Sequence, residues 1–338
     1  MDERDIRDYQ RMMQDDIRMQ AYFQAIQKLC PGKVVCEVGL GLGPLSLMAL
    51  NVGAERVYGI EVRPNVLELA QRVIRNHGYD EKRFVGFEGL STCVELPERV
   101  DVILSETLDG VVFGENTALF LLDACERFLK PGGVIIPEGI ASKVALANPV
   151  EFERQLEFWS EKLQQRYGLN YRDVATELNL HNQSIAVTPD ELLSDWTHWH
   201  DVEFAKPETI AYPRPVELWP TRPGLARGFA VAFEATLAQG VHLRTFPSDP
   251  GTSWKQGFSP FRHPVECSVG DLIWLDVQIG SGEDTRVSVR PRVLHIDASR
   301  APTFIADLQR SGASRSAEAE EGLESADPAE EKPPLPSS

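Results

Sequence analysis

Two glutamates nine positions apart, Glu106 and Glu115, bracket a short and mostly apolar stretch of the sequence that also carries Asp109. Paired carboxylates can accept hydrogen bonds from the N–H fork of a planar guanidinium, which binds carboxylates in bidentate fashion. Taken singly, each acid has a plainer interpretation: Glu115 would favour the start of a helix through its dipole, and Glu106 would be a solvated loop acid. As a pair, they predict a site for a planar cation.

A glycine-rich turn precedes this pair along the chain. Gly39, Gly41 and Gly43 stand between an apolar segment, KVVCEV, and a helical one, PLSLMALNVG, and missing side chains let a backbone approach a ligand closely. Such loops can also be nothing more than tight turns. The second strand ends in Glu61, about 20 residues after the loop, where an acid can accept hydrogen bonds from both hydroxyls of a ribose. The pattern indicates a nucleotide-like cofactor.

The elements that must position these residues follow from the periodicity of the chain. Apolar segments alternate with helical segments of about 10–15 residues, which predicts a parallel, doubly wound sheet. Its first four strands are expected at KVVCEV, RVYGIE, RFVGFE and VDVILSE. Ligands bind at the carboxyl edge of such sheets, and the fourth strand delivers Glu106 to that edge.

The sequence divides into four regions. Residues 1–30 are expected to form a helix, and residues 31–140 the α/β domain. Residues 141–300 change to short alternating segments between Pro- and Gly-rich turns, which is typical of an antiparallel sheet or barrel. Residues 301–338 are acidic, with few large apolar residues, and are expected to be a disordered tail.

Charge and composition exclude several classes of function. The formal net charge of −17 argues against nucleic acid or an anionic membrane as a partner. No apolar run approaches the roughly 20 residues that cross a bilayer, and the N-terminus is charged, so a cytoplasmic location is expected. The five cysteines are scattered without a CxxC spacing, which suggests neither a disulfide framework nor a metal site.

The motifs together resemble a known family. The string E-x-G-x-G-x-G, followed by an acid that ends the second strand, is similar to the loop of class I S-adenosylmethionine-dependent methyltransferases, and the double-glutamate loop resembles that of the protein arginine methyltransferases. The resemblance implies S-adenosyl-L-methionine as cofactor. It places Glu37 and the glycines beside the methionine part, Glu61 on the ribose, and Leu90 and Ser91 beside adenine.

Other matches extend the resemblance over most of the chain. Arg18 matches an arginine that meets the cofactor carboxylate, Met12 a methionine that lines the active site, and Tyr9 is a candidate to cap the cofactor. The segment GTSWKQ resembles the family's Thr-His-Trp loop, with Ser253 in place of histidine, and Trp254 is expected to stack on the substrate. A literal Thr-His-Trp at Thr197–Trp199 lacks the Lys-Gln that follows in the family, and is interpreted as coincidence.

The resemblance implies a class I methyltransferase domain followed by a β-barrel-like domain, with a dimerisation arm at about residues 167–196 that would form a homodimer. The expected reaction is N-methylation of an arginine guanidino nitrogen, in a peptide or in free L-arginine, catalysed by Glu106 and Glu115. Asp109 favours a monomethyl product. Two alternatives stay open: a non-catalytic S-adenosylmethionine-binding partner subunit, and a small-molecule amine methyltransferase of specialised metabolism.

Overall fold

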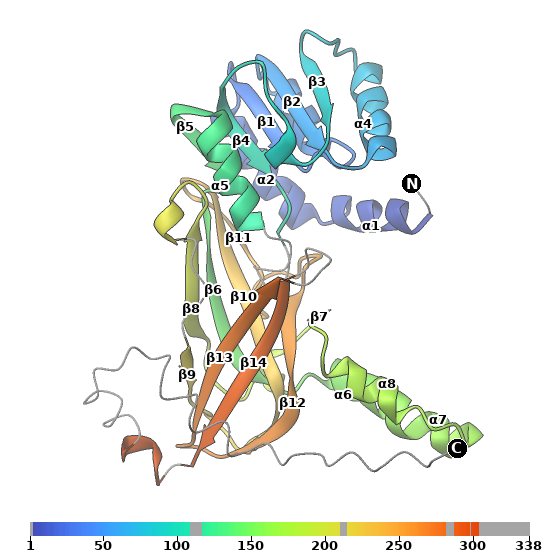
Figure 1. Cartoon of the computed structure of the whole chain (residues 1–338), viewed down its shortest axis with the longest axis vertical. Coiled ribbons are helices and arrows are strands. Elements are labelled where there is room, and N and C mark those ends of the chain that lie inside the picture. The colour runs from blue at the N-terminus through green and yellow to red at the C-terminus, as the bar shows by residue number, and fades with distance from the viewer. Residues whose placement is uncertain (1–2, 109–116, 210–214, 282–286, 298, 304–338) are drawn as a thin grey trace, which may run out of the picture.

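The structure is a computed structural model that describes residues 3–108, 117–209, 215–281, 287–297 and 299–303. Figure 1 shows an α/β domain at one end of the molecule, an antiparallel β domain at the other, and a group of helices that projects from the β domain. Among the described residues, no helix has the length and apolar character needed to cross a membrane.

The N-terminal segment forms two helices, where the sequence predicts one helix over residues 1–30. Helix α1 spans Glu3–Met13 and helix α2 spans Asp16–Leu29. They separate because the carboxylate of Asp15 accepts a hydrogen bond from the backbone N–H of Arg18 at 3.0 Å and so caps α2. The cap decides where α2 begins, and with it where Arg18 lies.

The α/β domain contains a five-stranded parallel sheet with the order β3-β2-β1-β4-β5. Its strands are β1 (Val34–Val38), β2 (Arg56–Glu61), β3 (Phe84–Glu88), β4 (Val100–Ser105) and β5 (Leu129–Ile136). The connections contain α3 (Pro44–Asn51), α4 (Pro64–Asn76), the 3-10 turn η1 (Ser91–Cys93) and α5 (Thr117–Phe128). The strand order reverses between β1 and β4, and such a switch point places a ligand crevice at their carboxyl ends.

The second domain contains two antiparallel sheets. The larger has the order β7-β12-β10-β6-β8, with β11 paired to β10, and the smaller has the order β14-β13-β9. The strands are β6 (Gly139–Ala147), β7 (Gln183–Ile185), β8 (Thr197–Glu203), β9 (Val216–Leu218), β10 (Gly224–Ala238), β11 (Val241–Arg244), β12 (Gln256–Cys267), β13 (Leu272–Ser281) and β14 (Val287–Ile296), with short 3-10 turns η3 (Pro189–Glu191) and η4 (Pro207–Thr209). Phe229 and Val231 of β10 share a buried core with Ile273 and Leu275 of β13, so the sheets pack face to face.

One hydrophobic core continues from the first domain into the second. Tyr22 and Ile26 of α2 are fully buried in the same cluster as Phe233 of β10 and Leu243 of β11. Apolar burial stabilises by about 25 cal/mol per Å², so a shared core of large side chains holds the two domains in a fixed relation. Helix α2 therefore lies at the junction of the two domains and packs against the strands of the second domain.

The projecting helices occupy an earlier stretch of chain than the arm predicted at about 167–196. They are α6 (Val150–Glu157), a π-helical turn η2 (Phe158–Lys162), α7 (Leu163–Tyr167) and α8 (Arg172–Leu178). Figure 1 shows them extending away from the α/β domain. Residues 183–185 already belong to the larger sheet, so we define the arm as residues 150–178.

Candidate active site

The glycine loop follows β1 at the carboxyl edge of the parallel sheet. Gly39 and Gly41 have φ values of 78° and 54°, in the left-handed region that favours glycine. A Cβ atom at Gly39 would lie 2.7 Å from Cγ2 of Thr107, just beyond β4, and one at Gly41 would lie 3.0 Å from Cε1 of Tyr9. The loop therefore needs glycine for its turns and also for the close approach of α1 and the β4 end.

Glu61 ties the end of β2 to this loop. Its side chain is buried, and Oε2 accepts a hydrogen bond from the backbone N–H of Gly41 at 2.9 Å. Its Oε1 accepts one from the backbone N–H of Arg63 at 3.0 Å. Because both bonds are charge-assisted, they hold the carboxylate in one orientation at the position predicted for ribose recognition.

Glu37 lies at the same edge, one residue before the end of β1. Its side chain is buried, and Oε2 accepts hydrogen bonds from the backbone N–H of Ser46, at 2.9 Å, and from the Ser46 hydroxyl. Burial raises the pKa of Glu37 to about 8, although the bonds from Ser46 oppose that rise. A bound cation would stabilise the ionised form of this buried carboxylate, which suits a position beside the ammonium group of an amino acid.

The segment after β3 combines an exposed apolar side chain with a fixed backbone. Leu90 is 59% exposed, whereas Ser91 is buried and its carbonyl accepts a hydrogen bond from the guanidinium of Arg127. Val62, beside Glu61, is also exposed, at 53%. Gly89 donates its N–H to the Glu61 carbonyl at 3.0 Å, which joins the two segments. Exposed apolar groups near the ribose position suit the face of an aromatic base.

Three elements meet at the guanidinium of Arg18. It forms an ion pair with Oε2 of Glu106, just after β4, and both side chains are about nine-tenths buried, at 11% and 10% exposed. The ring of Trp254 lies 4.9 Å from the Arg18 guanidinium carbon, and the indole N–H donates to the carbonyl of Leu108 at 2.8 Å. Burial lowers the pKa of Arg18 from its usual value. The sequence assigned Arg18 to the cofactor and Glu106 to the substrate, and the structure brings both to one point.

Asp15 is a residue that the sequence analysis missed. In addition to capping α2, it accepts a hydrogen bond from the backbone N–H of Ser253 through Oδ2, at 2.6 Å. One carboxylate thus joins the start of α2 to the loop that carries Trp254. The available signal was local: an aspartate that precedes a helix is a strong N-cap candidate.

Of the other residues predicted for the substrate half, the structure describes Met12 but neither Asp109, predicted to bind the substrate, nor Glu115, predicted to be catalytic. Met12 lies near the end of α1, half-buried, and its carbonyl accepts a hydrogen bond from the Asp15 backbone at 3.4 Å. Asp109 and Glu115 lie outside the described residues. At the described ends of that stretch, the hydroxyl of Thr117 donates to the carbonyl of Thr107 at 2.6 Å.

Comparison with known proteins yields both a domain and a family. A methyltransferase-domain family model matches residues 36–136. "Probable protein arginine N-methyltransferase 6" of Arabidopsis thaliana is 34% identical over 343 positions, which cover 87% of this chain and 76% of that protein. The chain belongs to the protein arginine N-methyltransferase family.

Two further relatives illustrate the range of the similarity. "Arginine N(omega)-methyltransferase" of Streptomyces achromogenes subsp. streptozoticus is 27% identical, covering 82% of this chain and 77% of that protein. A solved chain of the Trypanosoma brucei PRMT1 enzyme-prozyme heterotetrameric complex with AdoHcy superposes with a TM-score of 0.71 at 18% identity, covering 86% of this chain and 98% of that one. The predicted fold class is a class I methyltransferase domain followed by a β-barrel-like domain. It is confirmed as a Rossmann-like parallel sheet followed by an antiparallel sheet domain.

The two candidate Thr-x-Trp segments of this arginine methyltransferase family member lie in different places. Trp199 is buried in the β-domain core, with its ring centroid 5.9 Å from that of Phe229. His198 pairs through Nε2 with Asp201 at 2.9 Å. Within the described ranges, no group of three or more His, Cys, Asp or Glu residues is placed to hold a metal ion. The segment that reaches Arg18, and the carbonyl of Leu108 beyond β4, is the one carrying Trp254.

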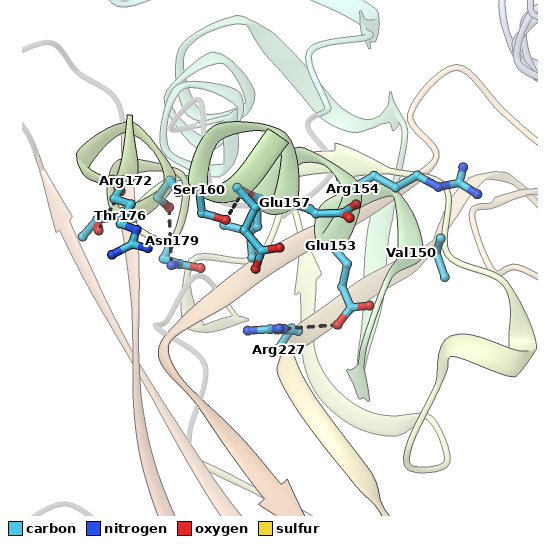
Figure 2. A pocket seen from close by; sticks show the side chains of 12 residues that line it. Val150, Glu153, Arg154, Glu157, Ser160, Arg172, Thr176, Asn179 and Arg227 are labelled. Carbon is cyan, nitrogen blue, oxygen red and sulfur yellow. Dashed lines mark hydrogen bonds and ion pairs between the residues drawn. The ribbon is translucent and has the colours of Figure 1, made fainter. Parts of the chain in front are cut away.

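A cavity of about 630 Å³ lies far from this edge, against the arm. Figure 2 shows charged side chains around it, including Glu157, Arg172 and an ion pair of 3.4 Å between Arg227 of β10 and Glu153 of α6. Figure 1 places the arm at the opposite end of the molecule from β1, β2 and β4. The candidate active site of this family member is therefore the carboxyl edge of the parallel sheet and not this cavity.

Proposed function

We propose that the chain is an S-adenosylmethionine-dependent arginine N-methyltransferase that transfers a methyl group to a guanidino nitrogen of arginine. One observation carries the assignment: Glu106 and Trp254 already accommodate a guanidinium, that of Arg18, through an ion pair and a ring contact of 4.9 Å. A carboxylate and an indole face are the partners that a planar guanidinium prefers in a partly buried site.

The residues at the sheet edge fit S-adenosylmethionine. Buried Glu37 suits the ammonium of its methionine part, Glu61 suits its ribose hydroxyls, and exposed Val62 and Leu90 suit its adenine. When bound, this cofactor supplies an electrophilic methyl group on a sulfonium. The left-handed glycine loop gives its backbone close access to the ligand.

Glu106 has two tasks in the mechanism. Arg18 holds its Oε2, which fixes the plane of the carboxylate, so we assign Oε1 to the N–H groups of the substrate. Guanidinium is a weak nucleophile because its lone pairs are delocalised and its pKa lies above about 12. By binding the fork, Glu106 and Glu115 would orient one nitrogen for in-line attack, stabilise positive charge on the others, and accept the proton released after transfer.

We propose Glu115 as the second carboxylate of this clamp. The supporting observation is the hydrogen bond from Thr117 to Thr107, because it brings together the described chain ends on either side of the stretch that contains Glu115. Arg18 balances the charge of Glu106, so a second carboxylate at the same site adds a negative charge that a substrate cation would balance. Met12 and Asp109 stay predictions as substrate contacts, and Asp109 is the proposed determinant of a monomethyl product.

The substrate is a peptide arginine or free L-arginine, and product analysis distinguishes them. The protein is incubated with isotopically labelled S-adenosylmethionine and either free L-arginine or a glycine- and arginine-rich peptide, and products are identified by mass spectrometry. We expect omega-N-monomethylarginine from one of the two substrates. Absence of label from both contradicts the proposed function, and a dimethyl product contradicts the role of Asp109.

A homodimer formed through the arm is the proposed assembly, and the cytoplasmic location stays a prediction. The arm projects from the β domain and exposes Phe158, Tyr167 and Tyr171, at 43%, 63% and 42%. Exposed aromatic side chains on a projecting element are typical of an interaction surface. Sedimentation velocity should show a dimer, and Tyr167→Ser with Tyr171→Ser should shift it towards monomer. A fully active wild-type monomer contradicts this proposal.

A further inference from the structure

Helix α1 lies over the glycine loop, and one side chain outside that helix fastens it there. The ring of Tyr9 covers Gly41, whose Cβ position is 3.0 Å from the ring. Arg63, which stands between β2 and α4, donates a hydrogen bond to the Tyr9 hydroxyl through Nη2. Its Nη1 lies 3.3 Å from Oδ1 of Asp5, also on α1. Two residues one turn apart on α1 thus meet the same guanidinium.

The same guanidinium is anchored on the other side by the cofactor-site acid. Nε of Arg63 lies 3.5 Å from Oε1 of Glu61, which also accepts the Arg63 backbone N–H at 3.0 Å. The Arg63 guanidinium carbon lies 5.6 Å from the centre of the Tyr9 ring, in cation–π geometry. Glu61 is buried and already bonded to Gly41, so Arg63 is held by a fixed group. A chain of contacts therefore runs from the glycine loop through Glu61 and Arg63 to α1.

Electrostatics favour this arrangement. Burial raises the pKa of the Tyr9 hydroxyl above its usual range, so at neutral pH the hydroxyl is uncharged and accepts the Arg63 N–H. The Arg63 guanidinium faces two carboxylates, Asp5 on α1 and Glu61 on β2, so its positive charge lies between two negative ones. A single exposed ion pair contributes little to stability. A guanidinium that joins two elements through several N–H donors loses less side-chain entropy for each hydrogen bond that it forms.

We propose that Arg63 is a positioning residue that latches helix α1 over the glycine loop and thereby sets how tightly the methyl-donor cofactor is retained. This inference rests on the proposed function for the identity of the cofactor. The latch acts on binding and not on transfer, because Arg63 contacts Asp5 and Tyr9 on α1 and Glu61 on β2. In the described part of the chain, no hydrogen bond or ion pair joins Arg63 to Glu106 or Trp254. It also keeps α1, and with it Met12, at a fixed distance from the sheet edge.

The first test separates the latch from catalysis. In Arg63→Ala we expect the dissociation constant of S-adenosylhomocysteine, measured by calorimetry, to rise about tenfold, while kcat at saturating cofactor stays within about twofold. Hydrogen–deuterium exchange of residues 3–13 should become about tenfold faster, with residues 16–29 unchanged as an internal reference. Arg75→Ala, which removes a positive charge from the exposed end of α4, is the matched control and should behave as wild type.

The second test asks whether Arg63 acts through α1 or only through Glu61. Tyr9→Phe removes the hydroxyl and leaves the contact of Arg63 with Glu61, and we expect about a threefold rise in the dissociation constant. Arg63→Lys keeps the charge without the planar fork and should fall between wild type and Arg63→Ala. In the double variant Tyr9→Phe/Arg63→Ala, the fold-change in the dissociation constant should be smaller than the product of the two single fold-changes, because both substitutions remove the same latch.

Distinct results overturn the latch and the proposed function. Unchanged exchange of residues 3–13 in Arg63→Ala overturns the latch, and so does an Arg63→Ala effect that persists in full on the Tyr9→Phe background. Faster exchange with an unchanged dissociation constant overturns its link to the cofactor. If wild-type protein binds no S-adenosylhomocysteine, the proposed cofactor is wrong, while the exchange comparison still decides whether Arg63 holds α1.

Discussion

The two halves of the candidate site are assembled in different ways. In the cofactor half, Glu37 and Glu61 are held by bonds to Ser46, Gly41 and Arg63, at separations of 9, 20 and 2 residues. In the substrate half, the bond from Trp254 to Leu108 spans 146 residues and that from Ser253 to Asp15 spans 238. The cofactor half is thus a product of local strand–loop–helix units, whereas the substrate half exists only when the β domain packs on α2.

This difference predicts different responses to substitution. A change in the cofactor half should alter cofactor affinity and leave the relation of the domains intact. A change in the substrate half should alter substrate binding or transfer together with stability, because the same residues join the domains: Trp254 packs against Phe233 at 5.9 Å in the core that also contains Tyr22.

Glu106→Gln should have the largest effect. The amide keeps the shape of the side chain but cannot accept a proton or balance a guanidinium charge, so we expect kcat to fall by about 1,000-fold. S-adenosylhomocysteine affinity, measured by calorimetry, should change by less than about threefold. Glu95→Gln, at a side chain 89% exposed, is the control. Full turnover by Glu106→Gln would exclude the carboxylate clamp and with it the difference between the halves.

Glu37→Gln should change the pH dependence of stability in the protein without added cofactor. Burial raises the pKa of Glu37 from 4.5 to about 8, so the folded protein binds a proton that the unfolded chain releases. Its contribution to stability is complete below pH 4.5 and is lost as the pH rises through 8, an effect of about 5 kcal/mol. In urea denaturation at pH 5, 6.5 and 8, the free energy of unfolding of Glu37→Gln should increase relative to that of wild type as the pH rises. A constant difference across this range would mean that Glu37 titrates normally.

The sequence predicted the cofactor half better than the substrate half, for the same structural reason. Glycine spacing and a terminal acid on the next strand are local patterns, and Glu37, Gly41 and Glu61 lie together as expected. The position of Trp254 came only from family resemblance, since periodicity does not report which loops meet across domains. The N-cap role of Asp15 has a local signal, but its bond to Ser253, 238 residues away, has none. The dimerisation arm at about residues 167–196 stays a prediction, and the helices that project from the β domain begin earlier, at Val150, because a helical pattern carries no signal of projection.

Glu61→Gln is expected to act on cofactor affinity alone. Loss of charge weakens the hydrogen bonds to Gly41 and to a bound ribose, so the S-adenosylhomocysteine dissociation constant should rise about 30-fold, or about 2 kcal/mol. Glu88 is its register partner at the end of β3 and is exposed, which makes Glu88→Gln the matched control. An equal effect of both substitutions would show that the edge responds to net charge rather than to a placed carboxylate.

Asp15→Ala should have a smaller effect, and it should act on stability and substrate binding rather than on cofactor affinity. It removes the cap of α2 and the bond to Ser253, for a loss of about 1 kcal/mol in unfolding free energy and a rise of about fivefold in the substrate KM. Asp16→Ala is the control, because Asp16 is the exposed neighbour in the first turn of α2. Steady-state kinetics with each ligand varied in turn provide the measurement. If cofactor affinity falls further than substrate affinity in Asp15→Ala, then α2 serves the cofactor first, and the division of the site into a local and a long-range half is wrong.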